Sequence, residues 1–501
     1  MNRREFVQGT CLGIAFLATP SWIRPALAQT PTDSLLNYDA IGLAELVRTK
    51  QVTPKELVEA TIRRIEALDG KINAVVTRTF EQALEAAEKV DLEAPLAGVP
   101  FLLKDNIDIA GVRTSNGSAF YKENIPTVSA PMVKAQEAAG LIIIGKTNMP
   151  EVGLIPSTES TFLGACHNPW DLGFSVGGSS GGAAAAVAAG YLPVAHASDG
   201  GGSIRIPASC CGLFGLKPSR RRMLPGSSDQ TEYMVDNCVS RSVRDSALLF
   251  SVTQDRSPDA PFKPVEFVTG PSKRRLKIGL CISDHFGKKP HQDVQKVIET
   301  TAKLCESLGH TAVKTEYPID GVEFETSFLA IFSEKISKLV AAAKAKTGKP
   351  AAESGLLERF TIDFEAKGRS LGSDAIEKGH KYMDTAGMKV AHWMQSLDLI
   401  LTPVLTTPPT ELGYLFDPTR DYEVISRRVF DYLAHLPIEN ALGLPAMSVP
   451  LGMSSNGLPI GSHFVAKAGD EKTLFELAYE LEQAKPWAKL WAPNSVKAKA
   501  V

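Results

Sequence analysis

The 501-residue chain has the composition of a soluble globular protein, with 44% hydrophobic and 22% charged residues. Lys and Arg number 54 against 56 for Asp and Glu, and the net charge is −2. No run of basic residues is long enough to form a nucleic-acid-binding surface, which argues against nucleic acid as a partner. The length would allow several domains, although large α/β enzymes of this size also form one unit.

The first 28 residues have the features of an export signal. An apolar stretch follows Arg3 and Arg4, and Pro25-Ala26-Leu27-Ala28 supplies a small-residue cleavage site. Paired arginines in this place are typical of twin-arginine signal peptides. A membrane anchor is the alternative, but the apolar stretch is shorter than the ~20 residues that span a bilayer. We expect a signal peptide over 1–28, a mature chain over 29–501 with no membrane segment, and a periplasmic or secreted bacterial protein.

The cysteines predict neither a disulfide framework nor a metal site. Cys11 lies in the signal, and the other six form no C-x-x-C pair and have no histidine at metal-finger spacing. Adjacent Cys210 and Cys211 suit buried small apolar residues better than a bridge. We expect mostly free, buried thiols at Cys166, Cys210, Cys211, Cys238, Cys281 and Cys305.

The first clear helix begins at Thr53-Pro54-Lys55-Glu56. Thr53 can cap the helix, Pro54 fits its first turn, and Glu56 completes a capping box. Apolar residues then recur at helical spacing until Asp69-Gly70, where we expect the helix to end. A second helix is predicted over about Glu81 to Val90.

Apolar strands and helices alternate after Pro95. A short buried strand is expected over 98–103, ending at Lys104, and a helix over 131–140 leads into a strand over 141–145. Residues 181–190 almost lack large side chains, so this helix should be central and closely packed. Alternation of this kind predicts an α/β fold whose sheet has helices on both faces.

The second half continues this alternation. Residues 254–275 are expected to form a surface connection, followed by a strand over 276–280, an amphipathic helix and a strand over 311–314. Residues 332–395 are predicted to be mainly helical and to form a cap over a site. Short apolar runs between turns occupy 438–465, and a helix is predicted over 471–483.

Lys104 is a candidate general base because it ends an apolar strand. Following Phe101-Leu102-Leu103, its ammonium group should be partly desolvated, which lowers the pKa of the amine. A neutral amine can accept a proton near pH 7. The alternative is a lysine that extends from the strand end into solvent. Taken alone, the residue favours that alternative.

Two glycine-rich segments each carry a serine. Gly177-Gly178-Ser179-Ser180-Gly181-Gly182 formally matches the nucleophile elbow of Ser-His-Asp hydrolases, although Ser179 could also relay protons or lie in a plain glycine turn. In the second segment three glycines, Gly200, Gly201 and Gly202, directly precede Ser203. Consecutive backbone N–H groups that no side chain shields can bind an oxyanion. They could also bind phosphate, but no Walker-type lysine follows.

Together these segments resemble the amidase signature family. The family patterns Gly-Gly-Ser-Ser-Gly-Gly and Asp-x-Gly-Gly-Ser-Ile-Arg-x-Pro match 177–182 and 199–207, with Lys104 upstream at the family's spacing. The resemblance runs over roughly 39–487. It includes the matching segments Gly215-Leu216-Lys217-Pro218, Ser242-Val243-Arg244-Asp245, Gly443-Leu444-Pro445-Ala446 and Gly457-Leu458-Pro459-Ile460-Gly461.

The resemblance implies a Ser-Ser-Lys amidohydrolase with no cofactor and no metal. Ser203 would attack the amide carbonyl, Ser179 would shuttle its proton, and Lys104 would be the final base. The bond before Ser179 would be a cis peptide, and the backbone N–H groups of Gly200, Gly201, Gly202 and Ser203 would form the oxyanion hole.

The rest of what the resemblance implies concerns the fold and the loop that carries Ser203. The expected fold is that of the family, a mixed central sheet covered by helices on both faces. Asp199 and Arg205 would brace the Ser203 loop. Gly200 departs from the family, whose members usually carry a larger residue there.

Several alternatives concern the reaction and its substrate. A Ser-His-Asp enzyme would need a histidine base, and His196 and His463 are candidates without supporting context. A solute-binding protein that kept only the scaffold is a second alternative, and the amidotransferase A-subunit branch, which works on cytoplasmic tRNA, a third.

Short stretches such as Val194-Ala195-His196 are most similar to the 6-aminohexanoate cyclic dimer hydrolase subgroup. The expected partner is a small-molecule amide, whose binding pocket would include residues 332–395 and Phe120-Tyr121. A homodimer stays open.

Overall fold

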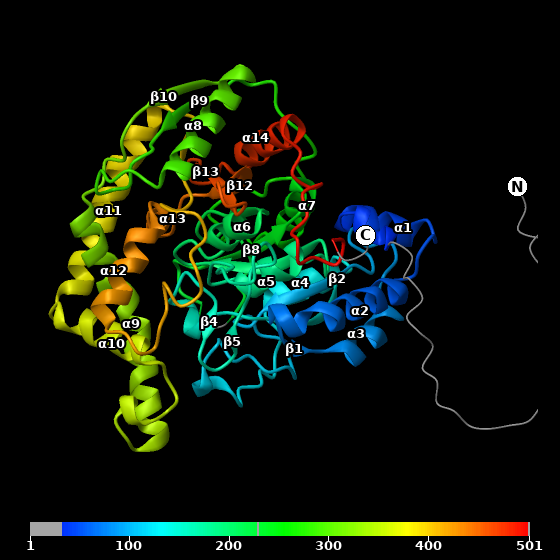
Figure 1. Ribbon diagram of the computed structural model, residues 1–501, viewed down its shortest axis with the longest axis horizontal. Coiled ribbons are helices and arrows are strands. Elements are labelled where there is room, and N and C mark those ends of the chain that lie inside the picture. Colours follow the sequence, from blue (N-terminus) through cyan, green and yellow to red (C-terminus); the bar gives the residue numbers. More distant parts are fainter. Residues whose placement is uncertain (1–32, 228–229, 499–501) are drawn as a thin grey trace, which may run out of the picture.

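The computed structural model describes residues 33–227 and 230–498, so the expected signal peptide and Cys11 lie outside the described residues. Within them, no helix combines the length and apolar character needed to cross a bilayer. A mixed eight-stranded sheet forms the centre of the molecule and helices flank it (Figure 1). The helices are α1 (Ala40–Arg48), α2 (Pro54–Ile72), α3 (Phe80–Ala87), α4 (Pro131–Ala138), α5 (Gly181–Ala188), α6 (Arg205–Cys211), α7 (Val243–Thr253), α8 (Gln292–Ser307), α9 (Gly321–Thr347), α10 (Arg359–Ser370), α11 (Ala375–Trp393), α12 (Tyr422–Leu433), α13 (Leu436–Ala441) and α14 (Glu471–Ala484).

The large sheet has parallel strands at one end and antiparallel strands at the other. Its order is β10 (Thr311–Lys314), β9 (Lys277–Leu280), β11 (Leu399–Pro403), β13 (Pro459–Val465), β12 (Ala446–Met453), β7 (Phe214–Lys217), β8 (Val235–Ser240) and β6 (Val194–Asp199). β10, β9 and β11 are parallel, and each later neighbour pair is antiparallel. The predicted mixed sheet is thereby confirmed.

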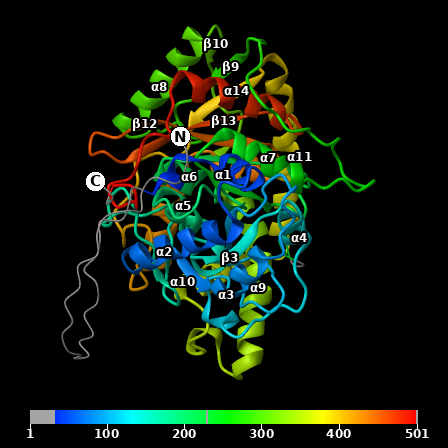
Figure 2. The ribbon, with the colours of Figure 1, turned by 90° about the vertical axis from the view of Figure 1, so that its right-hand side faces the viewer.

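A smaller sheet carries Lys104. β2 (Pro100–Lys104) pairs in parallel with β3 (Ile142–Thr147), and β1 (Val75–Arg78) pairs antiparallel with β3. The backbone N–H of Lys104 donates to Nδ1 of His196 on β6 over 3.2 Å, so the end of β2 lies against the edge of the large sheet. α2 and α3 pack on the small sheet (Figure 2). A two-stranded ribbon, β4 (Glu159–Ser160) and β5 (Gly164–Ala165), lies outside both sheets.

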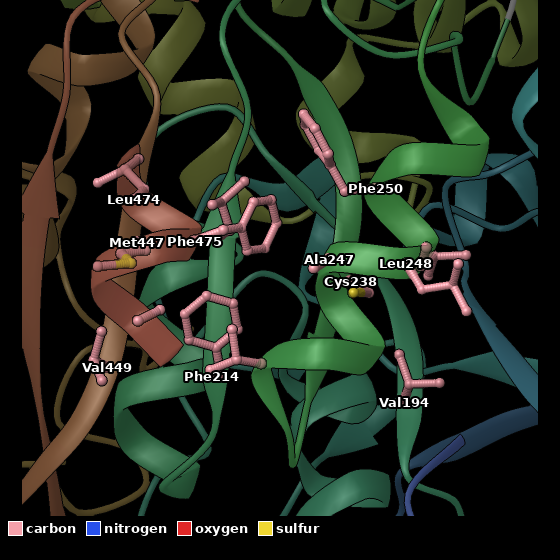
Figure 3. Packing of buried hydrophobic residues seen from close by; sticks show 14 of the residues in the cluster. Val194, Phe214, Cys238, Ala247, Leu248, Phe250, Met447, Val449, Leu474 and Phe475 are labelled. Atoms are coloured by element: carbon pink, nitrogen blue, oxygen red, sulfur yellow. The ribbon is translucent and has the colours of Figure 1, made fainter. Parts of the chain in front are cut away.

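Successive residues of β7 show how the large sheet is covered on both faces. Phe214 packs against Phe475 of α14, which also contacts Phe250 of α7, with ring centroids 6.2 and 5.3 Å apart (Figure 3). The next residue, Gly215, faces the opposite way, because a Cβ there would lie 2.8 Å from Ala208 of α6. Side chains alternate between the two faces of a strand. The sheet therefore lies between α7 and α14 on one face and α6 on the other.

The small-residue helix predicted over 181–190 is α5, and all eight of its residues are buried. Gly182 has no room for a side chain, because a Cβ there would collide with the backbone of Asn148. Such close approach explains the composition of the helix and holds the serine loop that precedes it at the centre of the molecule.

A layer of helices built from α9, α10, α11 and α12 stands along one side of the molecule, opposite α1–α3 (Figure 1). The predicted helical region is confirmed, but α9 begins at Gly321, eleven residues before the expected start. Asp320 caps this helix by accepting the N–H of Glu323, so the helix starts at a local capping signal.

The ends of other predicted elements differ by a few residues. α2 continues past Gly70 to Ile72, because Asn73 adopts the left-handed conformation that ends the helix. Its capping box at Thr53 and Glu56 is present as expected. Residues 254–275 contain no named helix or strand, in agreement with a surface connection.

Candidate active site

Lys104 is buried at the end of β2, with 1% of its surface exposed. Its Nζ lies 2.6 Å from Oγ of Ser179 and 3.0 Å from Oγ of Ser198. Burial lowers the pKa of Lys104 to about 7, and the negative charges of Asp236 and Asp199 oppose this shift only in part. About half of the amine is therefore neutral near pH 7, as the family resemblance implies and contrary to the solvent-exposed lysine that the residue alone favoured.

Ser179 lies in the loop before α5, and the Gly178–Ser179 peptide bond is cis, as expected. The loop is fixed to β6 through the next residue. Ser180 Oγ donates to the carbonyl of Ser198 at 3.1 Å and accepts the N–H of Ser198 at 3.2 Å. The N–H of Ser180 donates to the carbonyl of Ser203 at 3.3 Å. These bonds hold the two serine loops side by side.

The Ser203 loop is organised by Asp199 beneath it. The carboxylate of Asp199 accepts the N–H groups of Gly202 and Ile204 at 2.7 and 3.1 Å. Burial by itself would raise the pKa of Asp199, but Arg205, Lys217 and the N–H of Gly202 together outweigh burial and hold the pKa below its usual value. The N–H of Gly202 is thus already engaged. Among the described residues, the N–H groups of Gly200, Gly201 and Ser203 have no hydrogen-bond acceptor in the protein.

Arg205 is fully buried and makes no contact with the cavity described below. It binds Asp199 on one side, and Glu439 and Asn440 of α13 on the other, at 3.1 and 2.6 Å. The prediction that Asp199 and Arg205 brace the loop is confirmed by these contacts.

Lys104, Ser179 and Ser203 all line one cavity of about 770 Å³. Within the described part of the chain, no direct hydrogen bond joins the two serine hydroxyls, which face the same space. The three catalytic candidates therefore converge on one site although they come from separate segments. Such a cavity is large enough for a small organic substrate.

The two histidine candidates lie elsewhere. His196 accepts the N–H of Lys104 through Nδ1, so its Nε2 carries the hydrogen and donates to Asp236. The ring nitrogens of His463 are engaged in hydrogen bonds with Thr402 and Arg205. Neither lines the cavity, and among the described histidines only His380 does. The arrangement gives no support to a Ser-His-Asp triad.

Other lining residues correspond partly to the predicted pocket walls. α9 and α10 contribute Phe328, Phe332 and Phe360, and Tyr121 is also a lining residue, whereas Phe120 packs against Lys346 outside the cavity. The contributions of Ser198, Tyr233 and α12 were missed, whereas His380, which hydrogen-bonds to Tyr233, lies within the predicted wall over 332–395. No glycine-rich pattern marks these residues in the sequence.

Comparison with known proteins identifies the family. A family model described as Amidase matches residues 56–475. The chain belongs to the amidase family. It is therefore a hydrolase that cleaves carbon–nitrogen bonds of amides, and the resemblance to this family seen in the sequence is confirmed.

Individual relatives in the amidase family align over nearly the whole chain. The AmiC protein of Mycobacterium leprae (strain TN) is 34% identical over 466 residues, which is 91% of this chain and 97% of that one. The 6-aminohexanoate-cyclic-dimer hydrolase of Pseudomonas sp. (strain NK87) is 34% identical over 479 residues, covering 90% and 95%. A solved structure of 6-aminohexanoate cyclic dimer hydrolase complexed with substrate has a TM-score of 0.84 at 31% identity, covering 92% and 99%.

Gly200, where family members usually carry a larger residue, adjoins another side chain in this amidase. A Cβ at Gly200 would lie 3.2 Å from Cγ of Met234, so Met234 fills part of the space that a larger residue would need.

Proposed function

We propose that this amidase hydrolyses small-molecule amides through an acyl-enzyme on Ser203, with Ser179 as the proton relay and Lys104 as the base. The observation that supports the assignment is the 2.6 Å contact between the Lys104 amine and the Ser179 hydroxyl inside the cavity that Ser203 lines. A neutral amine in this place can accept a proton, because burial lowers the pKa of Lys104 to about 7.

In this scheme Oγ of Ser203 bonds to the amide carbon as its proton passes to Ser179, and the Ser179 proton passes to Lys104. The carbonyl electrons move onto oxygen, where the N–H groups of Gly200, Gly201 and Ser203 are placed to donate. The fourth expected donor, Gly202, is engaged with Asp199 and instead shapes the loop. The carbon–nitrogen bond then breaks as the proton returns through Ser179 to the departing nitrogen, and water later releases the acid.

Labelling with a fluorophosphonate tests this assignment, because such a reagent phosphonylates an activated serine. The wild-type enzyme should gain one adduct on Ser203, and Ser203→Ala should gain none. Ser426→Ala is a matched control, because Ser426 lines the same cavity outside the Lys104–Ser179 contact. An adduct on another residue, or undiminished amide turnover by Ser203→Ala, would contradict the assignment.

The substrate can be sought in a panel of amides that includes the cyclic compound named in the relatives. Because the relatives include 6-aminohexanoate-cyclic-dimer hydrolases, we propose that cyclic and linear amides of this size enter the cavity. Hydrolysis followed by mass spectrometry would decide between cyclic, linear, aryl and peptide amides.

We further propose that the enzyme is exported through the twin-arginine route and acts in the periplasm or outside the cell. Arg3 and Arg4 before the apolar stretch support the proposal. The six described cysteines are free and buried, so this part of the chain needs no oxidising compartment to fold. The mature chain would act on soluble amides without nucleic acid or membrane as a partner. A homodimer stays a prediction that light scattering can test.

A further inference from the structure

The cavity is lined in part by side chains of α9, α10 and α12. Six of its lining residues there are apolar and each is less than 9% exposed. We call this region the apolar arm, and it is formed by Ile336, Leu339, Phe360, Phe364, Val429 and Leu433. Aliphatic and aromatic side chains of this kind contact apolar ligands favourably because their burial removes apolar surface from water.

The apolar arm is continuous with the reacting centre. Five of its six residues belong to the same packed cluster as Ile155 and Ile206, which also line the cavity. Ile206 lies directly under the Ser203 loop, since a Cβ on Gly202 would lie 2.8 Å from its Cδ1. Ser203 and the apolar arm therefore belong to one cavity, in which Ile155 and Ile206 connect them.

Apart from Lys104, the acidic and basic side chains that line the cavity are partly or fully exposed, unlike the buried side chains of the arm. Glu334 and Lys338 are exposed and form an ion pair with each other at 3.5 Å. Glu232 is exposed, and Lys335 is half-buried and already has an interaction partner. A charged group that entered the arm would lose its water without gaining a counter-ion from the described residues that form it, which is unfavourable.

We propose that the apolar arm binds an uncharged alkyl or aryl group of the substrate, so that the enzyme selects neutral amides with one sizeable apolar side. The proposal rests on the assignment of Ser203 as the reacting group. It names the substrate class for that site: amides whose larger apolar part carries no free ammonium or carboxylate group.

Matched substrates test the selection. Propanamide, hexanamide and 6-aminohexanamide vary the acyl side, and N-propylacetamide, N-hexylacetamide and N-(6-aminohexyl)acetamide vary the amine side. On at least one side, three added methylenes should raise kcat/KM by about fourfold each, or on the order of 50-fold. The terminal ammonium should remove most of that gain.

A charge introduced into the arm should reverse the preference. Val429→Asp places a carboxylate in the arm and should lower the ratio of kcat/KM for the hexyl compound to that for its amino analogue at least about tenfold. Val429→Asn, which is polar but neutral, should lower turnover of the hexyl compound without favouring the ammonium. Val424→Asp is the matched control, because Val424 is on the same helix, 41% exposed and outside the cavity. It should leave the ratio unchanged.

The outcomes separate the two proposals. One outcome is that the wild-type enzyme is labelled at Ser203 but hydrolyses hexanamide no faster than propanamide, and N-hexylacetamide no faster than N-propylacetamide. In that case the apolar arm is not a binding site and the Ser203 assignment stands. If Val429→Asp is folded by circular dichroism and retains the wild-type ratio, the arm is likewise refuted. If Ser203 is not labelled and none of the six amides is hydrolysed, both proposals fail.

Discussion

At the scale of single residues, the Lys104 amine is held by two hydroxyl groups with different surroundings. Ser179 lies on the cavity side, whereas Ser198 Oγ also accepts a hydrogen bond from Nδ2 of Asn106 at 3.0 Å. With Ser198 accepting an N–H of the neutral amine, the lone pair of the amine is free to face the Ser179 hydroxyl. The contact with Ser198 thus orients the base, whose pKa is lowered by burial.

The pKa of Lys104 sets a pH dependence of the reaction. Because the neutral amine is the active form, kcat/KM should fall about tenfold per pH unit below the pKa of about 7 and reach a plateau above it. Lys104→Met should lower kcat/KM at least about 100-fold and should abolish the fall of kcat/KM at low pH, which we call the acidic limb. Steady-state rates from pH 5 to 9, with melting temperatures as the folding control, test this. If the acidic limb persists in Lys104→Met, it reflects the titration of another group.

Ser198 is predicted to be a positioning residue. Ser198→Ala removes an acceptor that favours the ammonium form, so the pKa of Lys104 should fall further and the acidic limb should move to lower pH. The plateau should fall at the same time, because the amine is no longer oriented. Ser198→Thr keeps the hydroxyl and should restore both features. A lower plateau with an unmoved limb would indicate a purely structural role.

Sequence reasoning found the residues that glycine patterns mark and missed those that they do not. Ser179 and Ser203 follow glycines that allow close backbone approach, and Lys104 follows a recognisable apolar strand. Ser198 is a single serine in β6, and the Tyr233–His380 contact joins residues 147 positions apart. Such contacts depend on the tertiary fold, so no local pattern could have indicated them.

At the scale of elements, the start of α10 is capped by a residue from another segment. Its own N-cap, Glu358, makes no side-chain capping bond. Instead the buried carboxylate of Glu151 accepts the N–H of Glu358 at 2.8 Å and the hydroxyl of Thr361 at 2.5 Å. A carboxylate at a helix N-terminus is favourable because it satisfies free N–H groups and complements the helix dipole. Glu151 therefore fastens the helix that carries Phe360 and Phe364.

Replacing this carboxylate should loosen one wall of the cavity. Glu151→Ala should lower the free energy of unfolding by about 1–3 kcal/mol, because buried donors lose their acceptor. The KM for amides with large apolar groups should rise severalfold, since Phe360 and Phe364 line the apolar arm. Urea unfolding and steady-state kinetics measure both quantities. Glu353→Ala, which changes an exposed glutamate before the same helix, should alter neither.

The element predictions that succeeded rested on local signals. The capping box at Thr53, the small-residue helix α5 and the strand that ends at Lys104 are all present. The early start of α9 at Gly321 was missed although Asp320 gives a local capping signal there. The extension of α2 to Ile72 was missed because the left-handed Asn73, not Gly70, ends that helix.

At the scale of the whole molecule, the chemistry and the walls of the cavity come from different parts of the chain. Strand ends and serine loops between 104 and 203 supply the reacting groups, whereas α9, α10 and α12 supply the apolar arm. The α/β class followed from the alternation of elements. The strand order did not, because β6 lies beside β8 and β13 beside β11 through pairings that local periodicity does not encode.

The export proposal concerns residues 1–28 and has its own test. Arg3→Lys together with Arg4→Lys keeps the positive charge but removes the paired arginines, so the precursor should accumulate in the cytoplasm if the route requires them. Cell fractionation with an amidase assay measures the distribution, and mass spectrometry of the exported wild-type protein should give an N-terminus at Gln29. Lys50→Arg, a conservative change at an exposed residue of the mature chain, should not affect export. Periplasmic activity that is unchanged in the double variant would show that the paired arginines do not direct export.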